Sequence, residues 1–319
     1  MHVVALRDQI LTLEERATPL PGPFDVVVAV RAAGINAADL LQRRGLYPAP
    51  PGWPVDVPGM EFAGLVVAAG EHVHEPLLGR RVCGVVGGGA QATHCVVPAE
   101  HLLFVPDHVS WLEAGGFAEA FLTAHDALVT QGDLARDEHV LISGAAGGVG
   151  VAAVQIAHAL GARVTAVTRD ATHHDALRAL GANETLTIDE LDQLGAVDVV
   201  LELVGAAHLE RAITHLAPFA RVVVIGLGGG ARMDLDLRVV MATRARLTGS
   251  TLRARSREEK ALVTDRVAHA LVPRWRTGDL HVPISRVFPL ADAAAAYDYF
   301  AQGGKFGKVI LAVDEAPLT

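Results

Sequence analysis

A glycine-rich segment inside one strand-helix-strand pattern constrains the fold of this chain more than any other feature. His139 to Ser143 is an apolar run of strand length, and the segment Gly144 to Gly150 that follows contains only Gly, Ala and a single Val. Apolar residues then recur at helical spacing until Gly161, which stands where a glycine usually ends a helix. A second strand-like run, Arg163 to Thr168, comes next. This order predicts a βαβ unit over His139 to Asn183.

The glycine loop predicts a binding site for the pyrophosphate of a dinucleotide. Residues without bulk let backbone amides approach the phosphates closely, and the helix that follows directs the positive end of its dipole toward the same charge. Ala145 stands where the usual fingerprint has its first glycine, which weakens the motif slightly. A glycine-rich turn without a ligand is the alternative, and the complete strand, loop, helix and strand favour the dinucleotide. The predicted pyrophosphate-binding residues are Ala146, Gly147, Gly148, Val149 and Gly150.

The end of the second strand predicts which dinucleotide is bound. An acidic residue there would accept hydrogen bonds from the ribose of NAD, whereas an arginine would pair with the 2′-phosphate of NADP. Thr168 falls at the acidic position, Arg169 follows it, and His173 comes one turn later. The sequence therefore favours NADP(H) over NAD(H). Asp170 is also acidic, and its other predicted role is to cap a helix over Thr172 to Leu180.

The chain as a whole shows two patterns and is predicted to have an α/β fold. Before Ser110, short Val-rich runs broken by Gly and Pro predict a compact, partly closed β domain; after it, strands alternate with helices as in a doubly wound parallel sheet. The segments after Leu262 are too few to form a domain alone, so we expect them to complete the first one. The expected domains are residues 1–115, 116–262 and 263–319. The predicted parallel strands are His139–Ser143, Arg163–Thr168, Val197–Leu203, Arg221–Ile225 and Leu247–Thr251.

Composition argues against several classes of protein. The formal net charge of -9 does not suit a nucleic-acid surface, and the Arg-rich stretch Arg244 to Lys260 is interpreted as a solvated loop and helix face. Val140 to Ala162 is uncharged over a length that could span a bilayer, but its glycines and its change of periodicity favour a soluble strand and helix. Cys83 and Cys95 are too few for a disulfide framework, and the amino terminus has no signal-peptide core. We expect a cytoplasmic protein with no nucleic-acid or membrane partner.

Further motifs are shared with one known family. They are Asn36 with Asp39, Arg44 to Pro48, Pro58 to Glu61 with Ala63 and Gly64, Glu119 to Ala124, Ala145 to Gly150, and Gly307 to Ile310. Through them the chain resembles the zinc-independent quinone oxidoreductases of the medium-chain dehydrogenase/reductase superfamily, and among these the p53-inducible branch. The resemblance covers essentially the whole chain. It implies a GroES-like β domain formed by both chain ends, a Rossmann domain between them, and an active site in the cleft. It also implies a homodimer through the Rossmann sheets, with Arg246 to Thr251 as the edge strand.

The resemblance also bears on zinc. Zinc alcohol dehydrogenases of this superfamily hold the catalytic metal with two Cys and one His, and the matching positions here are Asn36, Met60 and Glu119. An amide, a thioether and one carboxylate are poor zinc ligands, and two cysteines cannot supply a four-cysteine structural site. We therefore expect no zinc. A reduced nicotinamide can instead deliver hydride directly to a quinone or enone, whose conjugated carbonyl accommodates the developing negative charge.

The resemblance assigns four residues to the reaction. Tyr47 would donate a hydrogen bond to the acceptor carbonyl, unless it is a rim tyrosine that packs on the cofactor or faces solvent. Asn36 would bond the nicotinamide ribose or the acceptor. Asp39 would orient Asn36 or cap a helix over Ala37 to Arg44, and the cap is favoured. Glu119 would act as an acid or a solvent-linked proton donor beside the nicotinamide, or else be only a polar residue in the first turn of a helix.

Topology and the resemblance predict the remaining cofactor contacts. Loops that leave the carboxyl ends of parallel strands line the ligand crevice of such sheets. The loop residues expected beside the ribose and nicotinamide are Val204, Gly205, Gly226, Leu227 and Gly228. The resemblance adds Thr123 at the carboxamide or its ribose, and Lys308 near the phosphates. For Lys308 a surface position on a strand is an equal alternative.

Three hypotheses about function follow. The leading one is an NADPH-dependent reductase of quinones or related small-molecule conjugated carbonyls. The enzymatic alternative is an enoyl thioester reductase, which would need basic residues for a phosphopantetheine or CoA arm, and the acidic composition of the chain favours it less. The third is a dinucleotide-binding sensor or structural protein with little turnover, which a fold alone does not exclude.

Overall fold

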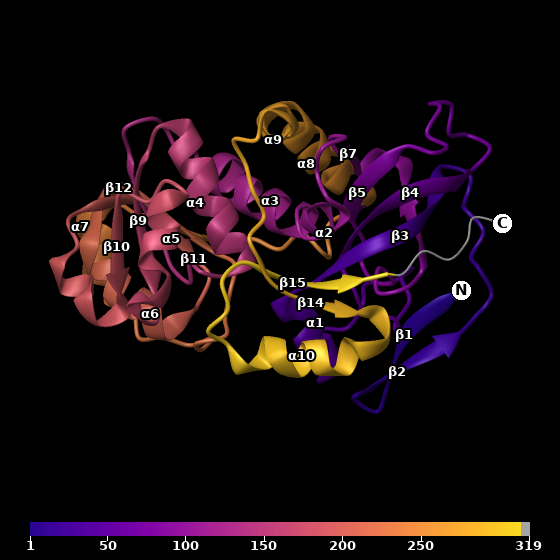
Figure 1. Ribbon diagram of the computed structural model, residues 1–319. Helices are drawn as coiled ribbons and strands as arrows, with labels where there is room; N and C mark the ends of the chain where they lie inside the picture. The colour runs from indigo at the N-terminus through magenta and orange to yellow at the C-terminus, as the bar shows by residue number, and fades with distance from the viewer. Residues whose placement is uncertain (314–319) are drawn as a thin grey trace. The chain divides into compact units, whose positions relative to one another are not determined.

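The computed structural model describes residues 1–313, which fold into two compact units. Unit 1 consists of Met1–Leu122 together with the chain from Leu252 onward, and unit 2 is Thr123–Thr251. The chain therefore leaves the first unit and returns to it, and Figure 1 shows indigo and yellow strands side by side in one sheet. No helix within residues 1–313 combines the length and hydropathy needed to cross a membrane.

The unit boundaries differ from the predicted ones at 115/116 and 262/263. The ring of Phe117 stacks on Phe121 at 4.2 Å between centroids and on Trp275 at 3.8 Å, which places the start of α3 (Ala118–His125) in the core of unit 1. At the other boundary, the Arg253 side chain donates a hydrogen bond to the backbone carbonyl of Gly87 at 2.9 Å. Aromatic packing and this buried hydrogen bond thus assign both boundary segments to unit 1.

Unit 2 is a doubly wound parallel sheet, which confirms the fold class predicted from the alternating strands and helices. Its strands lie in the order β10-β9-β8-β11-β12-β13, and every neighbouring pair is parallel. The strands are β8 (His139–Ile142), β9 (Arg163–Thr168), β10 (Glu184–Thr187), β11 (Val197–Glu202), β12 (Leu216–Val224) and β13 (Arg246–Gly249). The helices are α4 (Gly148–Leu160), α5 (His174–Ala179), α6 (Ala206–Ala212) and α7 (Leu237–Thr243), with shorter turns η2 (Asp126–Gln131), η3 (Ala171–His173), η4 (Ile188–Gln193) and η5 (Ile213–His215). Parallel strands run in one direction, so the carboxyl ends of β8, β9, β11 and β12 share one edge of the sheet.

Unit 1 contains a seven-stranded sheet built from both parts of the chain. Its main order is β14-β15-β3-β4-β5-β7, and β6 also pairs with β3. β15 is antiparallel to β3, with Val309 opposite Ile35. The strands are β3 (Asp25–Ile35), β4 (Glu61–Ala69), β5 (Arg81–Val85), β6 (His94–Pro98), β7 (Leu102–Phe104), β14 (Ile284–Pro289) and β15 (Lys308–Ala312), with a separate antiparallel pair β1 (His2–Arg7) and β2 (Ile10–Glu15). The helices are α1 (Ala37–Arg43), α2 (Trp111–Ala114), α8 (Arg257–Ala270), α9 (Val272–Thr277) and α10 (Ala293–Gln302), with turns η1 (Ala99–His101) and η6 (Leu290–Asp292).

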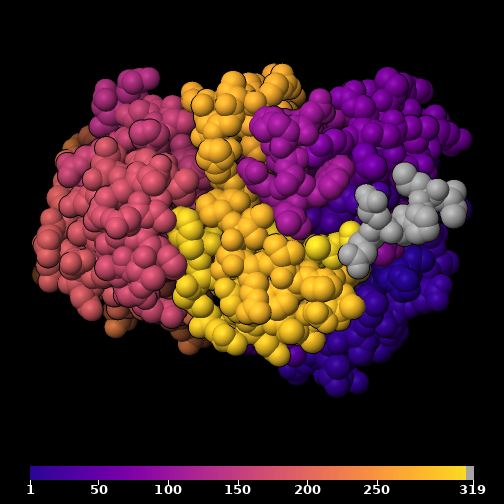
Figure 2. Space-filling view, in the orientation of Figure 1, coloured from indigo at the N-terminus to yellow at the C-terminus, as the bar shows by residue number. Residues whose placement is uncertain are grey.

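The core of unit 1 lies between its sheet and the helices that pack on it. The carboxyl-terminal segment with α10 forms a broad part of the face seen in Figure 2, while Tyr297 of the same helix is fully buried and donates to Gln91 Oε1 at 2.8 Å. Cys83 and Cys95 are both buried in this unit and are not disulfide-bonded. Burial raises the pKa of both thiols.

Candidate functional site

The glycine loop of unit 2 joins β8 to α4 and is shaped by two close backbone contacts. Gly144 has φ +58°, so the left-handed residue of the loop precedes Ala145, which does not need a glycine's freedom. A Cβ on Gly150 would lie 2.6 Å from the Cα of Ala145, so only glycine lets the helix start against the loop. Within the described residues no side chain caps α4 at its N-cap residue Gly147. The first amides of α4, those of Gly148, Val149 and Gly150, therefore have the arrangement that a phosphate site requires, whereas the Gly147 amide donates to the Gly144 carbonyl at 3.0 Å.

The helix after this loop ends as predicted. Gly161 adopts φ +80° and its amide donates to carbonyls in the last turn of α4, at 2.9 Å to that of His158. A residue with a Cβ would be strained in this left-handed conformation. The glycine stop fixes the point at which the chain turns into β9.

The end of β9 leaves one cation exposed at the position predicted to select the nucleotide. Thr168 is buried, and its hydroxyl donates to the backbone carbonyl of Asp170 at 2.7 Å and accepts from His174 Nε2 at 2.9 Å. The Asp170 carboxylate accepts from the backbone amide of Thr172 at 2.9 Å, so its predicted capping role is confirmed. Arg169 is exposed and makes no hydrogen bond or ion pair to any residue in the range 1–313. The Asp170 carboxylate is thus bonded to the backbone, whereas the Arg169 guanidinium is not.

The helix predicted over Thr172 to Leu180 is divided in two. A 3-10 turn over Ala171–His173, which includes the predicted ligand His173, precedes α5. The Asp170 cap begins the turn, and the chain reaches α-helical geometry only at His174.

A buried carboxylate that the sequence analysis missed holds the loop after β11. Glu202 is fully buried, and its Oε1 accepts hydrogen bonds from Ser143 Oγ at 2.7 Å and from the backbone amides of Val204 and Gly205 at 2.7 and 2.8 Å. His208 Nδ1 lies 2.6 Å from Oε2. Burial by itself raises the pKa of Glu202, but the hydrogen bond and charge of His208 and the loop donors outweigh it and lower that pKa. In the sequence, the only sign of this buried carboxylate is that a glutamate ends the Val-rich run 197–202.

The loops after β11 and β12 pack against each other. The amide of Gly229 donates to the carbonyl of Val204 at 2.6 Å, and a Cβ on Gly226 would lie 2.1 Å from the carbonyl oxygen of Leu203. Leu227, between two glycines, is 56% exposed. The predicted residues Val204 and Gly226 to Gly228 therefore lie together at the carboxyl edge of the sheet.

In unit 1 three predicted residues meet around Glu61, a residue to which the sequence analysis gave no role. Lys308 Nζ lies 2.5 Å from Glu61 Oε1 and donates to Asn36 Oδ1 at 2.5 Å, and Asn36 Nδ2 donates to Glu61 Oε1 at 2.9 Å. The backbone amide of Glu119 donates to Glu61 Oε2 at 3.0 Å. Glu61 is 0% exposed and Lys308 is 2% exposed, so the surface alternative for Lys308 is wrong. The pairing of β15 with β3 brings this lysine beside Asn36.

Asp39 and Asn36 form a capping box at the start of α1. The backbone amide of Asn36 donates to Asp39 Oδ2 at 2.8 Å, and the backbone amide of Gly59 donates to Asp39 Oδ1 at 3.2 Å. Burial raises the pKa of Asp39 to about 6. Asp39 therefore both helps to cap the helix and fixes Asn36, the two roles that the sequence left open.

The residues at the zinc-ligand positions do not suit zinc. Asn36 Oδ1 already accepts a hydrogen bond from the Lys308 ammonium, Met60 offers a buried thioether, and Glu119 supplies the one carboxylate. Zinc prefers thiolates and imidazoles in a closed tetrahedron. No group of three or more His, Cys, Asp and Glu residues in the described part of the chain is placed to hold a metal ion.

Tyr47 lies beside an arginine whose environment the sequence analysis predicted wrongly. Arg253 is 7% exposed and donates to the Tyr47 backbone carbonyl at 3.0 Å and to Gln42 Oε1 at 2.5 Å, and its guanidinium carbon is 5.1 Å from the centre of the Tyr47 ring. Lys260 is also buried, at 5% exposed. The interpretation of Arg244 to Lys260 as a solvated segment is therefore wrong at these two positions, because neutral backbone and amide oxygens hold Arg253 inside.

Three further predicted site residues differ in burial: Tyr47 and Glu119 are half-buried, and Thr123 is buried. The Tyr47 hydroxyl makes no hydrogen bond to any residue that the structure describes. Glu119 is half-buried on α3, and Thr123 of the same helix is 9% exposed.

Two family models match the chain. The model described as alcohol dehydrogenase GroES-like domain matches residues 22–133, and the model described as zinc-binding dehydrogenase matches residues 148–268. The chain is 30% identical over 320 residues to human synaptic vesicle membrane protein VAT-1 homolog, covering 92% of this chain and 80% of that protein. It is 27% identical over 323 residues to human quinone oxidoreductase, covering 97% and 94%. It is also 31% identical over 315 residues to a phenolphthiocerol/phthiocerol polyketide synthase of Mycobacterium tuberculosis, covering 96% of this chain and 14% of that protein.

Solved structures match the whole chain as well. A mycobacterial protein in complex with NADPH superposes with a TM-score of 0.86 at 26% identity, over 98% of this chain and 100% of that one. An NAD-dependent alcohol dehydrogenase superposes with a TM-score of 0.86 at 27% identity, again over 98% and 100%. With its GroES-like unit, its parallel Rossmann sheet and these relatives, the chain belongs to the medium-chain dehydrogenase/reductase superfamily.

Proposed function

We propose that this protein is an NADPH-dependent reductase of quinones or related conjugated carbonyls, which transfers hydride directly and without zinc. The cluster around Glu61 carries the proposal. At the place that matches the catalytic zinc ligands, the amide oxygen of Asn36 accepts from the Lys308 ammonium. An ammonium donates hydrogen bonds but is no Lewis acid for an alcohol oxygen, and a conjugated acceptor does not need one. The quinone oxidoreductase relative supports this substrate class.

Arg169 supports NADPH as the reductant. Its guanidinium is exposed at the carboxyl end of β9, and the neighbouring Asp170 carboxylate is occupied by the Thr172 amide. A free guanidinium is suited to bidentate pairing with a 2′-phosphate. The structural relative with bound NADPH agrees with this choice, whereas the NAD-dependent relative shows that the fold alone does not determine it.

The residues of unit 1 would serve the acceptor. Bound NADPH supplies the hydride, and the protein has to stabilise the oxyanion that forms on the acceptor and deliver a proton. Tyr47 is suited to donate to that oxygen, because its hydroxyl has no partner among residues 1–313 and the Arg253 charge beside its ring favours negative charge nearby. We assign the solvent-linked proton to Glu119, and the fixing of Asn36 against the nicotinamide ribose to Asp39.

An enoyl thioester reductase is the second candidate, because the polyketide synthase relative matches nearly the whole of this chain. The fold and the reductant would be the same, and the acceptor would carry a thioester in place of a quinone carbonyl. The matching region is only 14% of that polyketide synthase, so the name of the relative does not identify a substrate for this chain.

The test is oxidation of NADPH or NADH by the purified protein with a panel of quinones, enones and enoyl-CoA esters, followed by the absorbance of the reduced cofactor. We expect turnover with NADPH and a quinone or enone. Enoyl-CoA as the preferred acceptor would select the second candidate. Tight NADPH binding without oxidation by any acceptor would contradict both and leave a sensor or structural protein.

A matched pair of tyrosine variants tests the acceptor site. Tyr47→Phe should lower kcat with little change in NADPH affinity, because only the hydroxyl is lost. Tyr299→Phe is the control, since that hydroxyl is bonded to Ser285 Oγ at 2.9 Å in the same unit. Equal kinetics for Tyr47→Phe and the unaltered protein would assign Tyr47 to packing.

We also propose that the protein is a homodimer and belongs to the p53-inducible branch of its family. β13 lies at one end of the sheet order in unit 2, as the resemblance implied, and its outer side has no partner strand in the described residues. Edge strands of this kind can pair with a second copy. Light scattering coupled to gel filtration tests the dimer, and a monomeric mass at micromolar concentration would contradict it.

A further inference from the structure

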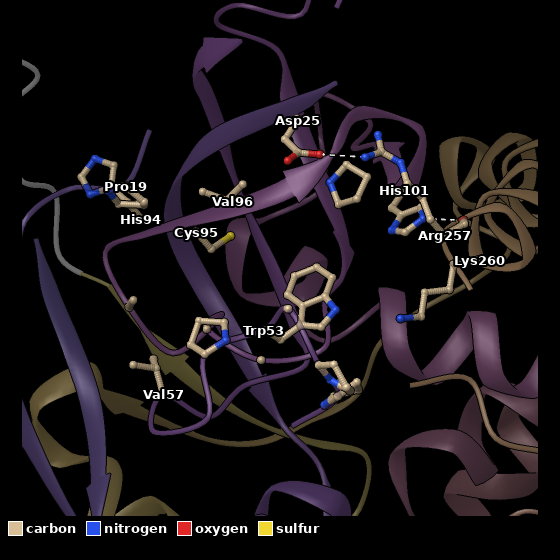
Figure 3. A pocket seen from close by; sticks show the side chains of 18 of the residues that line it. Pro19, Asp25, Trp53, Val57, His94, Cys95, Val96, His101, Arg257 and Lys260 are labelled. Carbon is tan, nitrogen blue, oxygen red and sulfur yellow. Dashed lines mark hydrogen bonds and ion pairs between the residues drawn. The ribbon is translucent and has the colours of Figure 1, made fainter. Parts of the chain in front are cut away.

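Unit 1 contains a pocket of about 640 Å³ that takes no part in the proposed reaction. All its lining residues belong to unit 1, and none of the site residues predicted from the sequence is among them. Figure 3 shows side chains from the loop around Trp53, from β6 and from the start of α8 around one space. The lining residues on which the argument rests are Trp53, Pro54, His101, Arg257 and Lys260.

Lys260 provides a buried charge without a counter-charge in this pocket. Its side chain belongs to α8 and is 5% exposed, and its ammonium points toward the indole of Trp53, 5.7 Å from the ring centre. It makes no hydrogen bond or ion pair with the residues that the structure describes. The sequence contains only three lysines, and in Lys308 the charge is matched by Glu61. A buried ammonium with neither an acceptor nor an anion is unfavourable, so a partner from outside would be bound there.

The acids near the pocket are already used by another cation. Arg257 pairs with Asp25 at 3.1 Å and with Glu100 at 2.7 Å. Figure 3 shows the Asp25 to Arg257 contact on the side of the pocket that holds His101. Asp25 and Glu100 are thus engaged by Arg257 and not by Lys260. Arg253 adds a further positive charge, and the hydrogen bonds described for it go to neutral oxygens. Burial, and after it the charge of Arg253, lowers the pKa of Lys260.

His101 adds a neutral imidazole to the same wall. Its Nε2 lies 2.9 Å from the carbonyl oxygen of Arg257 and must donate to it, because a carbonyl only accepts. Burial lowers the pKa of His101, so Nδ1 carries a lone pair, and this buried atom has no partner among the described residues. The pocket thus combines an ammonium donor and a Trp face, with a neutral histidine in its wall.

We propose that this pocket binds a small molecule that carries an anionic head group, a carboxylate or a phosphate, on a flat apolar body. The head group would pair with Lys260, and the flat body would lie against Trp53 and the prolines of its loop. The volume suits a molecule of this size, since ligand pockets span about 300–1,000 Å³. The inference does not depend on the proposed reductase activity, because it concerns binding within unit 1 alone.

Calorimetric titration of the intact protein with four probes of one shape tests the proposal. They are 2-naphthoate, 2-naphthyl phosphate, and the neutral 2-naphthamide and 2-naphthol. We expect at least one anion to bind roughly tenfold or more tightly than its neutral counterpart, because a hydrogen bond to a charged group is lost with the neutral probe. Preference between the two anions identifies the head group. Equal affinity for charged and neutral probes, or no binding of either anion, would overturn the proposal.

Variants of the lysines locate the charge. Lys260→Met should weaken binding of the preferred anion roughly tenfold to a hundredfold and leave the neutral probe unchanged, and Lys260→Arg should restore part of the loss. Lys305→Met is the matched control in the same unit. Anion binding that survives Lys260→Met unchanged would refute the role of Lys260. The comparison of charged and neutral probes uses the unaltered protein, so it holds even if a variant fails to fold.

Discussion

Replacing Lys308 by Met tests how far the buried cluster of unit 1 depends on its one cation. The Glu61 carboxylate, which is 0% exposed, would keep only the Asn36 side-chain amide at 2.9 Å and the Glu119 backbone amide at 3.0 Å. Removing one partner of a buried ion pair leaves an uncompensated charge and costs about 3–5 kcal/mol. We expect Lys308→Met to lower the free energy of unfolding of unit 1 by this amount.

The double variant separates the charge effect from the loss of packing. Glu61→Gln with Lys308→Met removes both charges. The new amide oxygen can accept from Asn36 or from the Glu119 amide but not from both, because these donors bond different oxygens of Glu61. The double variant should therefore be more stable than the sum of the two single changes predicts, by about 2 kcal/mol or more. Lys305→Met is a matched control, because its ammonium donates to the neutral Phe300 carbonyl at 3.1 Å, and its cost should be about 1 kcal/mol or less.

Tryptophan fluorescence during urea unfolding is the assay. The three tryptophans of the chain, Trp53, Trp111 and Trp275, all lie in unit 1, so the signal reports this unit and not the Rossmann sheet. Linear extrapolation gives the free energy of each variant. A cost of Lys308→Met below about 1 kcal/mol, or additivity of the two changes within about 0.5 kcal/mol, would refute a charged, coupled pair. A large loss of NADPH affinity at unchanged stability would instead support the phosphate role predicted for Lys308 from the sequence.

Three further predictions concern single residues. Gly150→Ala should weaken NADPH binding roughly tenfold or more, measured by cofactor fluorescence, because its Cβ would lie 2.6 Å from the Ala145 backbone and displace the start of α4. Arg169→Ala should raise KM for NADPH roughly tenfold and leave KM for NADH unchanged; an equal rise for both would reject Arg169 as the phosphate ligand. Asp39, whose pKa is raised from 3.8 to about 6, holds its proton more tightly when folded, so its contribution to stability falls by about 3 kcal/mol as pH rises through that window. Asp39→Asn should remove this part of the pH dependence in urea midpoints, and an unchanged pH profile would contradict it.

Local signals predicted the Rossmann unit well. β9 has the predicted bounds Arg163–Thr168, and Gly161 is left-handed at the end of α4, because a glycine stop and an apolar run act over a few residues. β10 (Glu184–Thr187) was not predicted. Its residues alternate weakly and include polar side chains, so its strand geometry depends on parallel pairing with β9.

The candidate site was predictable only where its contacts are local. The capping box of Asn36 and Asp39 spans one helical turn, and the sequence pattern indicates it directly. The bond between Lys308 and Asn36 joins residues 272 positions apart and exists only because β15 returns to β3. The pattern of charged residues likewise predicted an exposed Arg253, whereas the side chain is buried. Its partners are carbonyl and amide oxygens, which a pattern of charges does not reveal.

The burial of both thiols has a consequence for a protein that handles electrophiles. Quinones and enones alkylate proteins by conjugate addition, and the attacking species is the thiolate. Cys83 is 0% exposed and Cys95 is 4% exposed, and the raised pKa of each keeps the sulfur protonated at neutral pH. The chain has no other cysteine. For the proposed substrates, burial and the raised pKa protect both thiols of the folded protein from alkylation.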